Sequence, residues 1–316
     1  MADPLAQVVT LLQPAAPFSK RVSGAGRWSL RRTEVGRPFY CAILAGTCRL
    51  AADGHEEILL REGDFVLIPS AHNFTMSSHA PTGPEDVVHT PILLPGGEFR
   101  LGSPEAPADV RQLVGYCDFR SPDADLLASL LPQLVHIRGV DRLAMLMQLV
   151  SDEASAQRPA RDMVLERLLE VLLIEAFRSD READAWPGLV RGLSDKRLTG
   201  VIRRMHEHPD HSWTVAALAK EAGLSRSAFY ERFRRAVGVA PMEYLLAWRM
   251  ALAKDLLRRA DASITEIAER LGYSSASTFT VAFTRHVGLP PARYARGGWQ
   301  NASGTEAPRA SWLLVG

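Results

Sequence analysis

An internal repeat of about 50 residues limits what this chain can fold into more than any other feature of its sequence. Five pairs of residues in the C-terminal third share this spacing: Phe229 and Phe279, Phe233 and Phe283, Gly238 and Gly288, Pro241 and Pro291, and Tyr244 and Tyr294. Three earlier pairs are one residue closer together: Leu218 and Ile267, Ala219 and Ala268, and Gly223 and Gly272. The second copy therefore has one extra residue after its glycine, where a turn can accommodate it.

Each copy predicts a helix that ends at glycine, a tight turn, and a second helix that begins after serine. Gly223 and Gly272 supply the left-handed conformation that ends the first helix of each pair. The expected N-caps are hydroxyl residues: Thr214, Ser225, Ser263 (with Glu266 as its capping-box partner) and Ser275. The two phenylalanines of each copy are four residues apart, so they share a helix face that we expect in the core. This is the helix-turn-helix plan.

A helix in the major groove reads base edges from its early turns, while neighbouring Arg and Lys side chains contact phosphates. In the first copy the outward positions predict DNA contacts by Arg226, Ser227, Tyr230, Glu231, Arg234 and Arg235. Ser227 and Glu231 can form hydrogen bonds with base edges, and Tyr230 can reach a thymine methyl group or a phosphate. The alternative for any one of these residues is a solvated position on an exposed helix.

The distribution of charge is consistent with an anionic partner for this part of the chain. Between Asp195 and Gln300, 17 Lys and Arg residues stand against 10 Asp and Glu residues, a net charge of +7. Because the whole chain carries +1, with 37 basic and 36 acidic residues, the remainder has 20 against 26, or −6. Such an excess favours nucleic acid as a partner, although it also occurs on ordinary solvated surfaces.

The stretch from about Trp213 to Tyr294 resembles the DNA-binding domain of AraC/XylS-type transcription regulators. The matching segments are Trp213-Thr214-Val215, Gly223-Leu224-Ser225-Arg226-Ser227, Trp248-Arg249-Met250, Ile264-Thr265-Glu266-Ile267-Ala268, Leu271-Gly272-Tyr273-Ser274-Ser275 and Pro290-Pro291 with Tyr294. This resemblance implies seven helices, two of which enter successive major grooves. It also implies a sequence-specific regulator of double-stranded DNA, more often an activator, with RNA polymerase as a partner if it activates.

In the second copy the expected DNA-contacting residues are Ser275, Ala276, Ser277, Thr280, Val281 and Arg285. Many members of the resembled family carry Gln or Arg where this chain has Ala276, Ser277 and Val281. Since alanine and valine can contact only methyl groups, we expect polar base readout mainly from the first copy. The second copy is expected to add apolar contacts and, through Arg285, a contact with phosphate.

The N-terminal part predicts a short helix followed by a small β-structure. Leu5, Val8, Val9 and Leu12 share one helix face before Pro14. Short apolar or alternating runs then lie at 40–44, 48–51, 57–60, 65–69 and 87–94, separated by turn signals such as Ala45-Gly46. Further helices are expected from about Leu126 to Phe177, where an apolar stripe favours either a dimer interface or packing on the chain's own β-structure.

The same part resembles the cupin-like effector domain of some AraC-type regulators. Gly46-Thr47-Cys48-Arg49-Leu50 and Gly63-Asp64-Phe65-Val66-Leu67-Ile68-Pro69 carry this resemblance. It implies a small-molecule effector, and Tyr40, Cys48, His72 and Phe74 are the candidate pocket residues. The strand at 39–41 lacks the His-x-His pair of metal-dependent cupins, and a single imidazole such as His72 does not hold a transition metal tightly. We therefore expect neither a metal nor another cofactor.

Two alternatives remain at this stage: a metal-dependent cupin enzyme fused to a DNA-binding domain, and a regulator that senses oxidants through cysteine. Cys48 and Cys117 have Arg49 and Arg120 nearby in sequence, which favours thiolates, but buried thiols that fill core space are more common. His206, His208 and His211 could suggest zinc, yet capping or solvated roles are expected. No Ser, Cys and His residues form an evident nucleophile and base, so we predict no enzyme.

These observations predict an α+β protein with four parts. Residues 1–120 form a cupin-like effector domain, 121–194 a helical linker that dimerises the chain, 195–296 the DNA-binding domain and 297–316 a flexible tail. No export signal or membrane-spanning apolar run is evident, and the three cysteines form no disulfide framework. We therefore expect a cytoplasmic homodimer.

Overall fold

The computed structural model describes residues 3–33, 37–70, 73–87, 90–95, 97–121, 124–156, 158–179, 188–260 and 262–298. These residues form two compact units. We name them after the roles that the sequence resemblance implies: the effector unit contains the described residues from 12 to 179, and the DNA-binding unit contains residues 3–11 together with the described residues from 188 to 298. Almost the whole of the predicted N-terminal helix, α1 (Pro4–Leu12), thus belongs to the DNA-binding unit and not with the residues that follow it.

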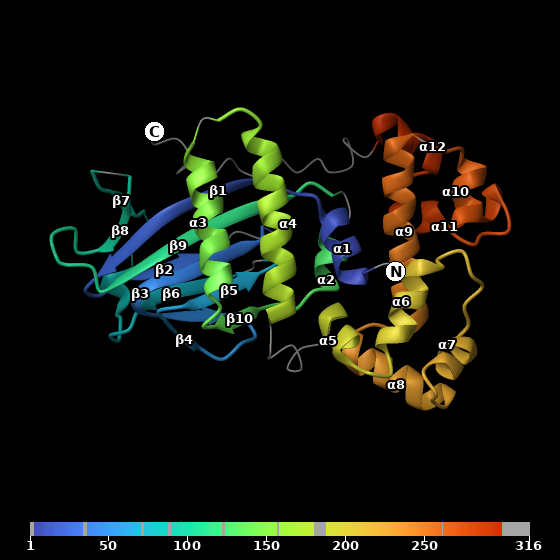
Figure 1. Ribbon diagram of the computed structural model, residues 1–316, viewed down its shortest axis with the longest axis horizontal. Helices are drawn as coiled ribbons and strands as arrows, with labels where there is room; N and C mark the ends of the chain where they lie inside the picture. Colours follow the sequence, from blue (N-terminus) through green and yellow to red (C-terminus); the bar gives the residue numbers. More distant parts are fainter. Residues whose placement is uncertain are drawn as a thin grey trace. The chain divides into compact units, whose positions relative to one another are not determined.

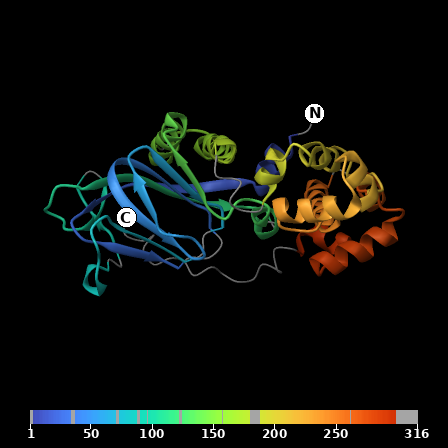
Figure 2. The same cartoon turned by 90° about the horizontal axis from the view of Figure 1, so that it is seen from below.

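The effector unit is built on a curled sheet, whose strands are drawn in Figures 1 and 2. Its strands are β1 (Pro14–Ala25), β2 (Ser29–Arg32), β3 (Phe39–Ala52), β4 (Ile58–Arg61), β5 (Asp64–Ile68), β6 (Phe74–Ser78), β7 (Ile92–Leu93), β8 (Phe99–Gly102), β9 (Val110–Phe119) and β10 (Val135–Arg138). The main path runs β10-β5-β3-β9-β1-β8-β7, while β4 and β6 pair with β3, and β2 pairs with β6. The predicted cupin-like fold is confirmed as a half-barrel.

The long strand β3 belongs to both halves of this curled sheet. Its first part pairs with β5 and β9, and its second part pairs with β4 and β6. The turn expected at Ala45-Gly46 is wrong, because the chain bends there through a register shift between Ile43 and Ala45 and continues as one strand. Gly46 has φ +78°, and a Cβ atom on it would lie 1.9 Å from the carbonyl oxygen of Asp109. The glycine is thus required by a close approach of two strands.

Helices cover one face of the sheet. The chain has a 3-10 turn at Pro84–Asp86 and a short helix, α2 (Ala124–Ser129). Two longer helices, α3 (Asp141–Ser155) and α4 (Arg161–Ser179), lie side by side against β1 (Figures 1 and 2). The buried side of α4 consists of Leu165, Leu169, Leu172, Leu173, Ala176 and Phe177. Most of the predicted apolar stripe therefore packs within the effector unit. Exposed apolar side chains remain on the outer side of the helix pair: Met145, Leu149, Met163, Val164 and Val171.

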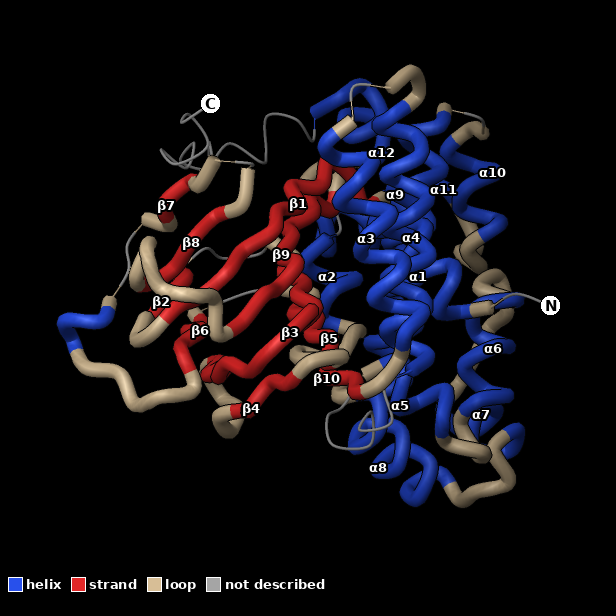
Figure 3. Tube along the Cα trace, turned by 60° about the vertical axis from the view of Figure 1, so that its left-hand side comes forward, coloured by secondary structure: helices blue, strands red, loops and turns tan. Residues whose placement is uncertain are grey.

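The described C-terminal residues form helices only, which Figure 3 shows in blue. They are α5 (Leu189–Ser194), α6 (Thr199–Glu207), α7 (Val215–Glu221), α8 (Arg226–Val237), α9 (Pro241–Arg259), α10 (Ile264–Arg270), α11 (Ala276–Val287) and α12 (Pro291–Arg293), followed by a wider turn at Tyr294–Gly298. The seven helices α6 to α12 match the implied number. Within the described residues, none of the helices has the length and apolar character to cross a membrane. Most of the predicted tail lies outside the described residues.

Candidate functional site

The first helix-turn-helix unit consists of α7 and α8, and its local signals act as predicted. The Thr214 hydroxyl accepts a hydrogen bond from the Ala217 amide at 3.1 Å, and the Ser225 hydroxyl accepts one from the Ala228 amide at 3.3 Å. Gly223, with φ +63°, lies in the turn between the two helices. These caps satisfy backbone groups at both helix starts, so they fix where α7 and α8 begin.

The second unit, α10 and α11, repeats this construction. The Ser263 amide donates to the Glu266 carboxylate at 2.7 Å while the Glu266 amide donates to the Ser263 hydroxyl at 3.2 Å, which completes the predicted capping box. The Ser275 hydroxyl caps α11 through the Thr278 amide at 3.1 Å. Gly272 has φ +74°, and a Cβ atom there would lie 2.2 Å from the carbonyl oxygen of Asp210. The second turn thus also requires glycine.

The repeated aromatic residues form equivalent clusters in the two units. Phe229 and Phe233 are fully buried, and the Phe233 ring meets Tyr244 edge to face with 5.7 Å between centroids. The equivalent rings Phe279 and Phe283 are also fully buried, and Phe283 meets Tyr294 at 5.5 Å. Each cluster anchors the inner face of α8 or α11, which confirms the predicted core role and leaves the outer faces available.

The outer face of α8 carries most of the residues of the first unit that are predicted to contact DNA. Arg226, Ser227, Glu231, Arg234 and Arg235 are exposed, and Tyr230 is half-buried. Arg232, which was not predicted, is paired with Asp195 at 2.7 Å. Desolvation raises the pKa of the Asp195 carboxyl, but Arg232 and the backbone amides of Arg197 and Leu198 together outweigh it and lower this pKa. Among the described residues, no ion pair involves Arg226, Arg234 or Arg235. Their guanidinium groups are therefore available to an anionic partner.

The outer face of α11 has a different chemical character. Ser275, Ser277 and Arg285 are exposed, and Ala276 is half-buried. Val281 is 70% exposed, the highest fraction among the exposed large apolar side chains of the described residues. Half-buried Thr280 donates its hydroxyl to the Ala276 carbonyl oxygen at 2.7 Å, so this group is already engaged within the helix. The middle of α11 thus offers methyl groups where α8 offers polar groups.

A buried polar cluster centred on His206 of α6 was missed by sequence reasoning, which expected a capping or solvated role. His206 is 3% exposed, and its ring stacks on Trp248 with 4.0 Å between centroids. Its Nδ1 atom donates to the Gln7 amide oxygen at 2.9 Å, and its Nε2 atom accepts from the Tyr244 hydroxyl at 2.6 Å. Burial lowers the pKa of His206 to about 3. The neutral imidazole therefore connects α1 to α6 and α9.

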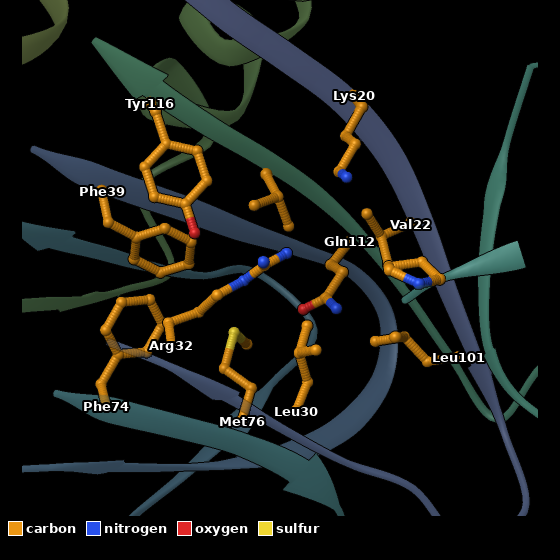
Figure 4. A pocket seen from close by; sticks show the side chains of 12 residues that line it. Lys20, Val22, Leu30, Arg32, Phe39, Phe74, Met76, Leu101, Gln112 and Tyr116 are labelled. Carbon is orange, nitrogen blue, oxygen red and sulfur yellow. The ribbon is translucent and has the colours of Figure 1, made fainter. Parts of the chain in front are cut away.

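The effector unit contains a cavity inside its curled sheet (Figure 4). The lining residues come mainly from six strands: Lys20, Val22, Leu30, Arg32, Phe39, Phe74, Met76, Pro91, Leu101, Gln112, Val114 and Tyr116. Of the predicted pocket residues, Phe74 lines this cavity, whereas Cys48 is buried elsewhere in the core. Tyr40 lies on the opposite face of β3, against Gly115. His72 lies outside the described residues.

The described cysteines are poor candidates for redox sensing. Cys41, Cys48 and Cys117 are buried and form no disulfide. Desolvation raises the pKa of Cys48 to about 12 and also raises the pKa of Cys41 and of Cys117. Because the thiolate is the reactive form, these thiols are suited to packing in the core. No group of His, Cys, Asp and Glu among the described residues could hold a metal ion.

Comparisons with known proteins agree with these two parts. The Cupin family model matches residues 3–180, and the model of a helix-turn-helix domain matches residues 218–297. An AraC-like transcription regulator of Streptomyces lividans is 33% identical over 299 residues, which cover 92% of this chain and 97% of the relative. The activator RclR of Escherichia coli, described as specific for RCS, is 27% identical over 297 residues, or 92% of this chain and 96% of the relative.

A solved structure is similar to the C-terminal part alone. The DNA-binding domain of AdpA in complex with a target DNA is 32% identical, covers 35% of this chain and 100% of that domain, and has a TM-score of 0.32. The relatives are transcription regulators and not enzymes, which leaves the fused cupin enzyme without support. The chain belongs to the AraC family of DNA-binding transcription regulators and combines a cupin effector domain with a C-terminal helix-turn-helix domain.

Proposed function

We propose that this regulator binds a specific operator in double-stranded DNA through α8 and α11 and that a small molecule in the barrel of the effector unit modulates this binding. The observation that carries the proposal is the equivalence of the two helix-turn-helix units. In both, two buried phenylalanines and a tyrosine hold one helix face, and the opposite face is exposed. Two equivalent exposed helices are suited to two successive major grooves of one duplex.

The two helices divide the recognition between them. Ser227 and Glu231 of α8 can form hydrogen bonds with base edges, and Arg234 and Arg235 are suited to phosphates. The α11 face presents Val281, while the Thr280 hydroxyl is held by the Ala276 carbonyl oxygen. Thymine is the base that carries a methyl group in the major groove. We therefore assign polar readout to α8 and thymine readout to α11.

We assign dimerisation to the outer side of the helix pair in the effector unit. Met145 and Leu149 of α3 are 61% and 52% exposed, and Val164 and Val171 of α4 are 40% and 41% exposed. The Arg142–Glu175 ion pair, at 3.7 Å, joins the start of α3 to the C-terminal part of α4, as expected for two antiparallel helices. A second copy of the chain would cover these exposed apolar side chains.

An activating role, with RNA polymerase as a partner and the cytoplasm as the compartment, completes the proposal. The name of RclR describes an activator, and this relative matches nearly the whole chain. Activation at a promoter needs contact with the polymerase in the compartment that holds the DNA. This role is tested separately from DNA binding by transcription in vitro with polymerase and the identified operator.

The proposed function is tested by incubating the purified full chain with a genomic DNA library at near-physiological salt and sequencing the bound fragments. We expect one enriched motif with two contact regions about one helical turn apart. The variant Phe229→Ala/Phe279→Ala, which removes an anchoring ring from each unit, should lose this enrichment. Equal recovery of all fragments at every salt concentration would refute sequence-specific binding, since only the electrostatic attraction to phosphates would then remain.

A further inference from the structure

The side chain of Arg249 lies between the two helix-turn-helix units. Figure 1 shows α9 between the pair α7 and α8 and the pair α10 and α11. Arg249 is half-buried near the middle of α9. Its Nε atom donates a hydrogen bond to the Pro209 carbonyl oxygen at 2.7 Å, and its Nη2 atom donates one to the His211 carbonyl oxygen at 2.9 Å. Both acceptors belong to the loop between α6 and α7, so Arg249 is fixed to the segment that leads into the first unit.

The same guanidinium group also reaches the turn of the second unit. It lies over the Tyr273 ring, 5.9 Å from the ring centre, where a cation is attracted to the face of an aromatic ring. The Tyr273 ring in turn meets the Phe279 ring edge to face, with 5.5 Å between centroids. Since Phe279 is the buried anchor of α11, Arg249 connects the loop before α7 to the aromatic cluster beneath α11.

The backbones of the two units also approach each other closely at this place. A Cβ atom on Gly272 would lie 2.2 Å from the carbonyl oxygen of Asp210 and 3.0 Å from Nη2 of Arg249. Among the described residues, a Cβ atom on the equivalent Gly223 would meet only the end of the Arg197 side chain, at 3.1 Å. Both glycines have positive φ, so they end their helices in the same way. They differ in that Gly272 alone of the pair lies against the other unit.

The repeat shows that the Tyr273 ring is not needed for the turn itself. The amides of Leu224 and Tyr273 donate to the equivalent carbonyl oxygens of Ala219 and Ala268, at 3.0 and 2.9 Å. The first copy thus forms the same hydrogen bond with an aliphatic residue in the place of the ring. The extra residue of the second copy is therefore Ser274, which follows the ring. The aromatic side chain serves the contact with Arg249 and Phe279.

We infer that Arg249, Tyr273 and Gly272 fix the orientation of α8 relative to α11 and thereby select operators by the spacing of their two contact regions. They act as positioning residues, and the inference rests on the proposed binding of α8 and α11 to successive major grooves. One inserted base pair rotates the second contact region by about 35° around the duplex. Two units held by this contact cannot follow the rotation. Without the contact, they remain joined through their packing on α9, which permits more orientations.

The test compares binding of the full chain to the selected operator and to versions with one base pair inserted or removed between the contact regions. We expect the wild type to bind the altered operators at least about tenfold more weakly, because specific base contacts are lost. Arg249→Met and Tyr273→Leu should reduce this ratio to about threefold, since they remove the attraction between cation and ring. Tyr273→Phe keeps the ring and should keep the ratio of the wild type.

Matched variants separate positioning from folding. Arg259 is an exposed arginine of the same helix that pairs with Asp255, so Arg259→Met should keep the ratio of the wild type. Gly272→Ala should lower the ratio, whereas Gly223→Ala, which introduces the same strain of positive φ, should keep it. If Arg249→Met weakened binding to all three operators by the same factor, the residue would act only in folding and the inference would be overturned.

A measurement without DNA separates this inference from the proposed function. Spin labels on Ser227→Cys and Ser277→Cys, at equivalent exposed positions of α8 and α11, report the distance between these helices by electron spin resonance, because the native cysteines are buried. Arg249→Met should widen the distribution of distances, and Arg259→Met should leave it narrow. Equal widths in the two variants would overturn the inference. The expected difference in width, without an enriched DNA motif, would refute operator binding alone.

Discussion

The buried His206 makes the stability of the DNA-binding unit dependent on pH in a predictable direction. Burial lowers its pKa to about 3 in the folded chain, whereas an unfolded chain has a histidine pKa of about 6.5. Between these two values the unfolded state binds a proton that the folded state does not bind. The stabilisation is therefore fully present above about pH 6.5 and decreases as the pH falls toward 3.

The size of this effect follows from the difference between the two pKa values. At pH 5, which is about 1.5 units below the pKa of an unfolded histidine, proton binding stabilises the unfolded state. This lowers the free energy of unfolding by about 2 kcal/mol relative to pH 8. If the proton bound in the folded state, Nε2 would become a donor and the Tyr244 hydroxyl would have to turn and accept from it. The charged ring would remain removed from water, which is the cause of its low pKa.

The assay is urea unfolding of the full chain between pH 8 and pH 5, followed by helical circular dichroism and by tryptophan fluorescence, to which Trp248, stacked on His206, contributes. His206→Gln removes the titrating group and retains a polar side chain. The difference between wild type and variant isolates His206 from the other histidines. We expect the wild type to lose about 2 kcal/mol more than the variant over this range. Parallel pH profiles for the two proteins would refute a buried neutral imidazole.

Further predictions concern the DNA-contacting face and the effector sheet. If Val281 contacts a thymine methyl group, replacing that operator thymine by deoxyuridine should weaken DNA binding of the wild type about fourfold and leave DNA binding of Val281→Ala unchanged. An equal loss of affinity in the two proteins would contradict this contact. Arg234→Ala should reduce the slope of log affinity against log salt by about 0.9 for every DNA sequence, and an unchanged slope would remove this residue from the phosphate contacts. Tyr230→Ala should change sequence preference more than affinity for random DNA, as a library selection can measure. Gly46→Ala should lower the free energy of unfolding by more than about 2 kcal/mol, whereas Gly54→Ala, at a similar φ of +80° with no atom near its Cβ, should cost about 1 kcal/mol.

The features predicted correctly from sequence depend on interactions within a few residues. Hydroxyl caps bond to amides three residues ahead, as Ser225 does with Ala228 and Ser275 with Thr278. Glycine at a left-handed position is also a local requirement, and the repeat shows each such signal twice. The two helix-turn-helix units could therefore be predicted in detail, including the buried phenylalanines.

The features that were missed depend on partners far away in the chain. Gly46 carries a turn signal, but the carbonyl that requires glycine there belongs to Asp109. His206 has the polarity of a surface residue, and its burial depends on Gln7, which is 199 positions away. In the cavity, the prediction selected Tyr40, whereas the adjacent Phe39 lines it. A shift of one position in a strand exchanges its two faces. The alternation of residues along a strand shows which side chains share a face, but it does not show which face lines the cavity.

The position of α1 has a consequence for the order in which the protein is made. Gln7 leaves the ribosome early in synthesis, and its partner His206 follows 199 residues later. At about 5–20 residues per second this interval is roughly 10–40 s, during which the entire effector unit is synthesised and can fold. The DNA-binding unit therefore includes a helix, α1, that is synthesised before the effector unit. A fragment that begins at residue 188 lacks this helix.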